Sequence, residues 1–259
     1  MDVNAIYSVS PWFAVLLIAV GIVAGVINTL AGGGSNLTLP ALMLMGLPAD
    51  VANATNRVGV LMQSVAAAKD FDKHGQLARH DLLGILKPTL LGSLVGAVIA
   101  AFAPSDWLKP ALLIAMVSMA LIILIRPNIV APPLGTKALS VSESPKAWGM
   151  LFVAGIYGGF VQAGVGFILI AALAGGLRYD LVKTNAIKLV CAAALTLTAL
   201  AVFVWQGLVA WLPGLILAVG TVIGAKIGVR VALNISPQGL KWFLFIMTVA
   251  ASAAALFKT

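Results

Sequence analysis

Four basic residues lie in or near long apolar stretches of the sequence, where their positions point to a bound anion. They are Arg57, Lys87, Lys188 and Lys226, whereas every acidic residue falls in a loop or at a predicted helix end. Charged side chains are costly inside an apolar layer and usually serve a function there. Because no acidic residue in these stretches can pair with the four cations, we expect an anionic ligand to compensate them.

Arg57 and Lys188 are the stronger candidates of the four. Each follows a Thr-Asn pair, Thr55–Asn56 or Thr184–Asn185, at the start of equivalent predicted helices. The other two cations lie nearer the ends of their helices, where a long side chain can reach the membrane surface instead of a ligand. We therefore place Arg57 and Lys188 in the predicted anion site.

Two glycine-rich breaks interrupt the apolar stretches, at Gly32–Gly34 and at Gly164–Gly166. After the first break, Ser35 and Asn36 are predicted N-cap residues of a short helix that returns toward the same side. The free N–H groups and the positive end of such a helix form a natural anion site. Close packing of helices on small residues is the alternative role for these glycines.

Asn28 and Gln162 align with each other when the two halves are compared, and each precedes one of the breaks by about one turn. Their amides would either donate to the anion or satisfy the free carbonyl groups of the broken helix, and the sequence leaves both roles open. The predicted anion site consists of the two breaks, these amides, the Thr-Asn pairs and the two cations: Asn28, Gly32, Gly33, Gly34, Ser35, Asn36, Thr55, Asn56, Arg57, Gln162, Gly164, Gly166, Thr184, Asn185 and Lys188.

Catalytic chemistry is not expected, because no His, Asp or Glu lies in mid-span to act as a base or a metal ligand. His74 and His80 share a polar loop with Asp70, Asp72 and Asp81. A metal site in this loop is an alternative, but solvated loops commonly have this composition. We therefore predict no catalytic residue, no resident metal and no cofactor.

The composition predicts which kind of secondary structure positions these residues. Of the 259 residues, 61% are hydrophobic and only 9% are charged, and the mean hydropathy is +1.09. A soluble domain carries about a quarter charged residues. The apolar residues form blocks close to the ~20 residues that a membrane-spanning helix needs, and they lack the alternation of barrel strands. The sequence therefore predicts an all-α, polytopic membrane protein. The apolar blocks are 11–31, 52–68, 82–103, 107–125, 147–174, 186–205, 208–229 and 238–257.

The two halves of the sequence resemble each other. The spacing Gly21–Gly25 recurs at Gly155–Gly159, and Gly92–Gly96 recurs at Gly220–Gly224. Matching features in the same order indicate a duplication. The predicted divisions are a first transmembrane repeat at 1–126, a cytoplasmic linker at 127–147 and a second transmembrane repeat at 148–259.

The basic residues of the loops predict that the two repeats are inverted. In a parallel arrangement these residues divide seven to five between the two sides of the membrane, whereas in an inverted arrangement they divide ten to two. Only Lys109 and Lys258 then lie outside, as do the termini. Because positive loops face the cytoplasm, inversion is favoured.

Inversion requires an odd number of crossings in each half. In the first half, 52–68, 82–103 and 107–125 are predicted to cross the membrane. The stretch 11–47 is predicted to enter, break at the glycines and return, because its second piece of about twelve residues rises only ~18 Å. Each repeat therefore has three full spans and a broken, re-entrant helix pair. Non-helical backbone at this depth belongs at the protein-covered centre of the bundle.

The N-terminal glycines and the residues after them resemble a known family. The stretch from Gly21 to Leu42, with Gly25, Gly32-Gly33-Gly34-Ser35 and Pro40, is followed by Ala52 and Thr55-Asn56. This pattern resembles the signature of the sulfite exporter TauE/SafE family of membrane proteins, and the duplication extends the resemblance over nearly the whole chain. The resemblance implies transport of sulfur-containing anions, such as sulfite, sulfonates or sulfoacetate, usually out of bacterial cells across the cytoplasmic membrane.

We therefore expect a secondary transporter that moves a small oxyanion by alternating access, with its site between the repeats. An anion channel of the same fold, or a carrier of another small organic anion, is the alternative. The expected partners are the anion and the lipid bilayer, while H⁺ or Na⁺ as coupling ion and a homodimer are left open. Nucleic acid is not an expected partner, because the basic residues are scattered rather than clustered.

Overall fold

The computed structural model describes residues 9–104, 107, 110, 114, 136–235 and 239 of the chain. This part consists of helices and connecting turns without any strand, which confirms the all-α prediction. The predicted spans 107–125 and 238–257 lie outside the described residues except at single positions. In chain order the elements are α2 (Pro11–Leu30), α3 (Ser35–Leu44), α4 (Ala49–Lys73), α5 (Leu82–Phe102), η1 (Val141–Glu143), α7 (Pro145–Phe160), α8 (Val165–Ile170), η2 (Ala171–Gly176), α9 (Leu181–Trp205) and α10 (Trp211–Asn234).

Four of the described helices are long and apolar enough to cross a membrane. These helices, α2, α5, α9 and α10, have 20 to 25 residues and a mean hydropathy between 1.8 and 2.5 over their most apolar windows. The helix α4 also has 25 residues, but it carries Arg57 within it and several charged residues at its ends. The short helices α3 and α8 follow the two glycine-rich breaks, as the sequence predicts.

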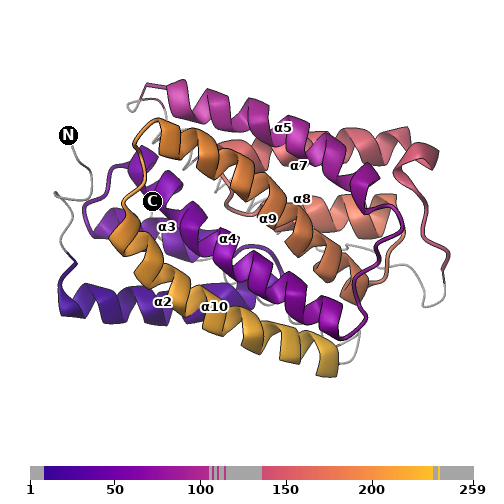
Figure 1. The fold of residues 1–259 in the computed structure, drawn as a ribbon, viewed down its shortest axis with the longest axis horizontal. Helices are drawn as coiled ribbons and strands as arrows, with labels where there is room; N and C mark the ends of the chain where they lie inside the picture. The colour runs from indigo at the N-terminus through magenta and orange to yellow at the C-terminus, as the bar shows by residue number, and fades with distance from the viewer. Residues whose placement is uncertain are drawn as a thin grey trace.

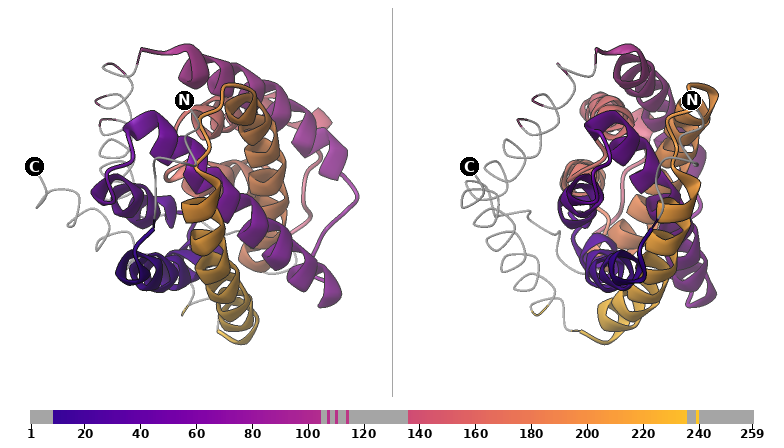
Figure 2. Two further views of the ribbon diagram at one scale, coloured as in Figure 1. Left: turned by 60° about the vertical axis from the view of Figure 1, so that its left-hand side comes forward. Right: turned by 90° about the vertical axis from the view of Figure 1, so that its left-hand side faces the viewer.

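Helices from the two halves of the chain pack against each other in pairs. The helix α2 packs along α10, α5 packs along α7, and α4 contacts α9 (Figures 1 and 2). The pairs touch at glycines: a Cβ atom at Gly25 would overlap the backbone of α10 at Thr221, and one at Gly159 would overlap the backbone of α5 at Ser93. Small residues allow this close approach of helix backbones. The first helix of each half therefore packs on the other half.

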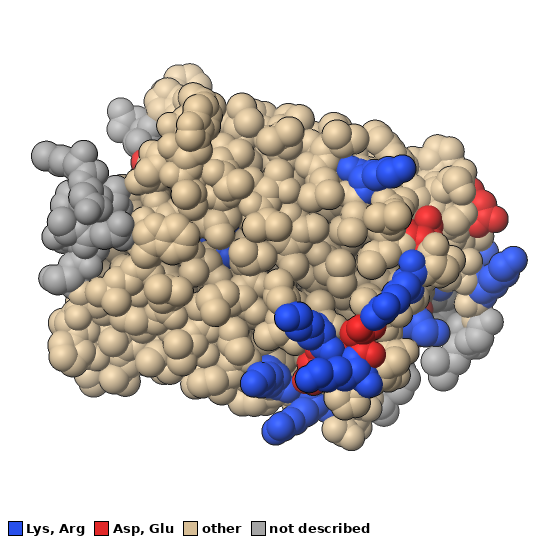
Figure 3. All heavy atoms as spheres, in the orientation of Figure 1, with Lys and Arg blue, Asp and Glu red and all other residues tan. Residues whose placement is uncertain are grey.

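Corresponding helices run in opposite directions along the long axis of the molecule. In Figure 1, α2 runs from left to right and α7 from right to left, and α4 and α9 are likewise opposed. Figure 3, in the same orientation, shows Lys and Arg side chains gathered toward the right-hand end. At that end α4 and α10 finish and α5, α7 and α9 begin.

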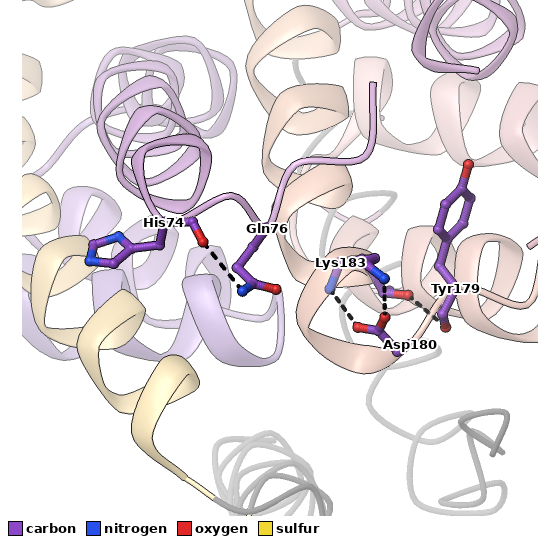
Figure 4. A network of polar contacts seen from close by, with 6 residues as sticks. His74, Gln76, Tyr179, Asp180 and Lys183 are labelled. Atoms are coloured by element: carbon purple, nitrogen blue, oxygen red, sulfur yellow. Dashed lines mark hydrogen bonds and ion pairs between the residues drawn. The ribbon is translucent and has the colours of Figure 1, made fainter. Parts of the chain in front are cut away.

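The start of α9 shows how a loop at this end positions a central helix. Asp180 is the N-cap residue, and its carboxylate accepts from the N–H of Lys183 at 2.9 Å (Figure 4). The Lys183 ammonium lies 3.1 Å from the same carboxylate. Thr184 turns back and donates to the carbonyl of Tyr179 at 3.2 Å. This cap aligns the predicted Thr184–Asn185 pair on the first turn of α9.

The polar loop with the two histidines is held by contacts within the loop and by one contact with η1. Arg79 forms an ion pair with Asp72 at 2.6 Å, His74 Nδ1 lies 2.7 Å from the carbonyl oxygen of Asp70, and Asp81 accepts from the N–H of Val141 at 2.5 Å. Within the part of the chain that the structure describes, no group of three His, Cys, Asp or Glu side chains is placed to hold a metal ion.

Candidate functional site

The two breaks meet at the centre of the helix bundle. The first lies between α2 and α3 and contains Gly32, whose φ is +95°. The second lies between α7 and α8 and contains Gln162 and Gly164, with φ of +70° and +78°. A Cβ atom on Gly32 would overlap the backbone of Gly166, and one on Gly166 would overlap Gly32. The structure therefore brings the two predicted breaks into direct backbone contact.

Gln162 occupies the same place in its break as Gly32 does in the other. The N–H of Gly32 bonds the carbonyl of Ile27 at 3.1 Å, and the N–H of Gln162 bonds that of Tyr157 at 3.5 Å, so the two helix ends close in the same way. The sequence comparison paired Gln162 with Asn28 instead. The shift arises because α2 continues five residues past Gly25, whereas α7 ends one residue past Gly159.

Arg57 closes the broken end of α7. Its side chain is fully buried, and the guanidinium donates to the carbonyls of Gly158 at 2.5 Å and Gly159 at 2.8 Å and to Oε1 of Gln162 at 2.5 Å. Asn53 donates to the next carbonyl, that of Phe160, at 2.9 Å. A helix leaves these last carbonyls without intrahelical partners, and a cation is favoured at this end. The protein itself therefore holds the Arg57 side chain in place, without a ligand.

Lys188 does the same for the broken end of α2. Its ammonium is almost completely buried and donates to the carbonyls of Asn28 at 3.1 Å and Thr29 at 2.9 Å, and to Oδ1 of Asn185 at 2.8 Å. Each cation thus lies on the central helix of one half and caps the broken helix of the other half. Of the two roles left open for Asn28 and Gln162, capping of the free carbonyls is carried out by Arg57, Lys188 and Asn53 instead.

The two cations leave the centre of the bundle positively charged. Among the described residues, no carboxylate bonds to Arg57 or Lys188. The C-terminal end of a helix carries roughly half a negative charge, so each cation retains roughly half of its own charge after capping one. An anion that enters this region meets a favourable field without displacing either cation.

A narrow recess lies beside the first break, between α2, α3, α4 and α10. The empty space within it and at its open mouth amounts to about 160 Å³, and no part of it is wide enough to seat a water molecule. Within its wall, Asn56 accepts from Thr38 at 2.6 Å and donates to Oγ of Ser35 at 3.1 Å. Because Ser35 Oγ accepts from Asn56, its own proton remains available as a donor. The polar residues of the wall are Asn28, Ser35, Thr38, Asn56, Gln63 and Thr221.

The sequence has recognisable relatives. A model of the family described as sulfite exporter TauE/SafE matches residues 17–255. The chain belongs to the TauE/SafE family. It is 27% identical to the probable membrane transporter protein YfcA of Escherichia coli (strain K12), over 98% of this chain and 93% of that protein. It is also 26% identical to the probable membrane transporter protein ORF9 of Sinorhizobium sp, over 90% of this chain and 88% of that protein. A probable membrane transporter protein of Haemophilus influenzae is 26% identical, over 93% of this chain and 94% of that protein. This TauE/SafE protein is accordingly a membrane transporter.

The prediction that Ser35 and Asn36 are N-cap residues is wrong in this TauE/SafE protein. The N-cap position of α3 is Gly34, and no side chain caps the helix. Ser35 instead bonds Asn56, because both side chains are buried in the same recess wall. Among the described residues, the N–H groups of Gly33, Gly34 and Ser35 make no backbone hydrogen bond, so the donors expected at this break are present.

The two Thr-Asn pairs of the TauE/SafE chain use their threonines for local structure. Thr55 accepts from the N–H of Ala210 at 3.0 Å at the start of α10, and Thr184 bonds the carbonyl that precedes α9. The asparagines point into the centre, where Asn56 joins the recess wall and Asn185 accepts from Lys188. Thus the asparagines lie nearer the candidate site than the threonines do.

Two of the four cations lie on the outside of the TauE/SafE fold. Lys87 on α5 and Lys226 on α10 are both exposed, unlike the buried Arg57 and Lys188. Exposure along a span fits a side chain that extends toward the membrane surface.

Sequence reasoning missed three polar residues of the recess: Thr38, Gln63 and Thr221. Helical spacing could have found two of them. Thr38 lies one turn after Ser35, and Gln63 lies two turns after Asn56, so each shares a helix face with a predicted site residue. Thr221 comes from the other half of the chain, and no local pattern connects it with the break.

Proposed function

We propose that this protein is a secondary transporter that moves a small sulfur-containing oxyanion, of the sulfite, sulfonate or sulfoacetate type, out of the cell. The observation that carries the proposal is the centre of the bundle, where two buried cations without carboxylate partners among the described residues flank free backbone N–H groups. Such groups favour an oxyanion over a cation or a neutral solute. The family description names sulfite as a substrate class.

The proposal places the protein in a bacterial cytoplasmic membrane as a multi-pass protein with two inverted repeats, 1–126 and 148–259, joined by a cytoplasmic linker. The opposite directions of α2 and α7, and the packing of each first helix on the other half, support this arrangement. The basic residues at one end of the long axis support a cytoplasmic position for that end. Both termini then face the outside.

Alternating access is favoured over a continuous pore by the closed recess. A channel needs a water-filled path, whereas the recess beside the first break is too narrow for a water molecule. Movement of one repeat against the other would open the recess to each side in turn. The contacts between Gly32 and Gly166 lie where the repeats meet, so this movement would take place around the paired breaks.

Each of the predicted site residues has a role in this proposal. The break residues Gly32 to Asn36 and Gly164 to Gly166 shape the centre and present backbone donors. Asn28, Asn56, Gln162 and Asn185 supply neutral polar groups, and Thr55 and Thr184 fix the starts of the helices that carry them. Arg57 and Lys188 supply the compensating positive charge from their positions on the helix ends.

Transport by purified protein in liposomes tests the proposal. Liposomes loaded with sulfite, sulfoacetate, sulfate or a carboxylate should release one of the first two faster with the protein than without it. The flux should saturate with concentration and should be stimulated by anion on the opposite side, as expected of a carrier. Absence of protein-dependent flux for the whole panel overturns the transporter proposal, and flux that neither saturates nor shows this stimulation replaces the carrier with a channel. Repeating the measurement with a pH or Na⁺ gradient identifies the coupling ion.

A further inference from the structure

Gln63 is a buried polar side chain that none of the interactions within the bundle explains. It lies on α4, two turns after Asn56, and only 1% of its surface is exposed. Its Nε2 atom has no hydrogen-bond partner among the described residues, although the side chain lines the recess. A buried donor left without a partner destabilises the fold, so a residue of this kind calls for a partner that is not part of the chain.

The donors around Gln63 converge on the same recess. The hydroxyl of Ser35 is oriented by Asn56 so that its proton can be donated, and the N–H groups at Gly34 and Ser35 begin the ten-residue helix α3. Asn28, at the end of α2, completes the wall. The backbone carbonyl oxygen of Asn28 accepts a hydrogen bond from Lys188, so a buried positive charge lies directly behind the wall.

The corresponding region of the second half lacks these groups. If the two N-cap glycines Gly34 and Gly164 are aligned, Ser35 corresponds to Val165. If the two Thr-Asn pairs are aligned, Gln63 corresponds to Ala192. Val165 packs in an apolar cluster with Leu169 and Leu195, and the helix that begins there continues from α8 through η2 to Gly176. The polar side chains of Ser35 and Gln63 are therefore not repeated at the corresponding positions of the second half.

We propose that the transported anion is held on one side of the centre, in the recess of the first half once movement of the repeats has widened it, and that Gln63 is a substrate-binding residue there. This inference rests on the proposed anion transport and makes it more specific. Neutral donors from Gln63, Ser35 and the start of α3 contact the oxygen atoms of the anion. Lys188 and Arg57 act through their field while they cap the broken helices. A set of donors without a carboxylate suits a small oxyanion such as a sulfonate or sulfite.

Replacement of Gln63 by methionine tests this role, because methionine keeps the length of the side chain but removes the donor. Loss of a hydrogen bond to a charged ligand corresponds to a weakening of about 10- to 100-fold. We expect the concentration of sulfite or sulfoacetate for half-maximal flux, and for half-maximal thermal stabilisation, to rise by this factor. The melting temperature without anion should stay equal or rise, since a buried unpaired donor has been removed.

Two further variants keep the test decisive. Gln63→Glu places a carboxylate in the recess and should abolish the thermal stabilisation by the anion. Thr198→Val on α9 is the matched control: it removes a hydroxyl that bonds its own helix at 3.1 Å, and it should leave anion affinity unchanged.

The outcomes separate this inference from the proposed function. Unchanged anion affinity in Gln63→Met or Gln63→Glu, beside a wild-type protein that binds and transports the anion, overturns the role of Gln63 and leaves the transporter proposal standing. A lower melting temperature of Gln63→Met with intact anion affinity shows a structural role and also overturns the inference. Absence of binding and flux in the wild-type protein overturns the proposed function itself.

Discussion

Behind the first break, α3 begins with Ser35 and Thr38 buried against Asn56, whereas behind the second break α8, which continues into η2, begins at Val165 in an apolar cluster. The ends of the helices before the breaks are alike, since each is capped by a buried cation from the other half. The two halves therefore share the cation-capped helix ends, which we call the shared frame, but not the polar side chains beside the breaks. The comparison separates residues that build the centre from residues that would bind a ligand.

The shared frame has a physical reason. Two helices that stop in the middle of an apolar bundle each leave free carbonyls, which water cannot reach. A cation reaching across from the other half satisfies several carbonyls at once and is favoured by the helix dipole. The hydrogen bonds of these cations also connect the two halves at the point where the halves would have to move relative to each other.

The largest expected effect comes from removing either cation. Arg57→Met leaves the carbonyls of Gly158 and Gly159 without donors, and Lys188→Met does the same for Asn28 and Thr29. Each orphaned acceptor costs about 1–3 kcal/mol, so each variant should lose on the order of 4 kcal/mol of stability. Thermal unfolding in detergent without anion measures the loss.

The conservative variants Arg57→Lys and Lys188→Arg provide the matched controls, because they retain a charged donor and should recover part of the stability. The shared frame requires the two methionine variants to be similarly unstable. If one of them has the same melting temperature as the wild-type protein, its helix end does not depend on the cation. The two halves then differ in their shared frame as well as in their recess.

The next effect concerns the contact between the breaks. Gly166→Ala puts a methyl group into the backbone of Gly32, and such overpacking costs about 1–3 kcal/mol. Gly32→Ala creates the same overlap and also places a side chain at φ +95°, so it should be the more destabilising of the two. Melting temperatures of the two variants in detergent show which of them is the less stable.

Gly149→Ala on α7 is the control for this pair, because a Cβ atom there meets no other atom within 4 Å. It should be neutral or slightly stabilising, since alanine favours a helix by up to about 1 kcal/mol over glycine. Equal melting temperatures for Gly32→Ala and Gly149→Ala would show that the breaks do not need to touch.

The sequence could predict the breaks and the two important cations because both leave local signals. Glycine runs interrupt apolar stretches, and an unpaired Arg or Lys stands out among apolar neighbours. What the cations contact could not be predicted, because Arg57 bonds residues about a hundred positions away on α7 and Lys188 bonds residues about 160 positions away on α2. Such long-range contacts have no local pattern.

The internal comparison of the sequence also placed one residue incorrectly. Aligning Gln162 with Asn28 follows the glycines inside the helices, but the helices end at different distances from those glycines. A helix end depends on where the backbone finds a cap, and the capping Arg57 and Lys188 lie on other helices. Gln162 instead takes the left-handed conformation that Gly32 takes in the first half, and a glutamine at such a position gives no sequence signal of that role.

The smallest expected effect lies in the segment that joins the halves. Glu143 accepts from the backbone N–H of Ser140 at 2.7 Å and from its hydroxyl at 2.9 Å, and these two hydrogen bonds lower the pKa of Glu143. Because the pKa of Glu143 is lower in the folded than in the unfolded chain, the contact stabilises the fold at pH values above the unfolded-chain pKa of about 4.3. This stabilisation is lost as the pH falls through the folded-state pKa.

Glu143→Gln should therefore melt at a slightly lower temperature than the wild-type protein at neutral pH, and the difference should vanish toward low pH. A difference that persists unchanged in acid would show that the charge of Glu143 does not support this turn. The capped helix ends, whose described contacts do not involve Glu143, should not respond to this substitution, so its effect would stay confined to the segment that carries Glu143.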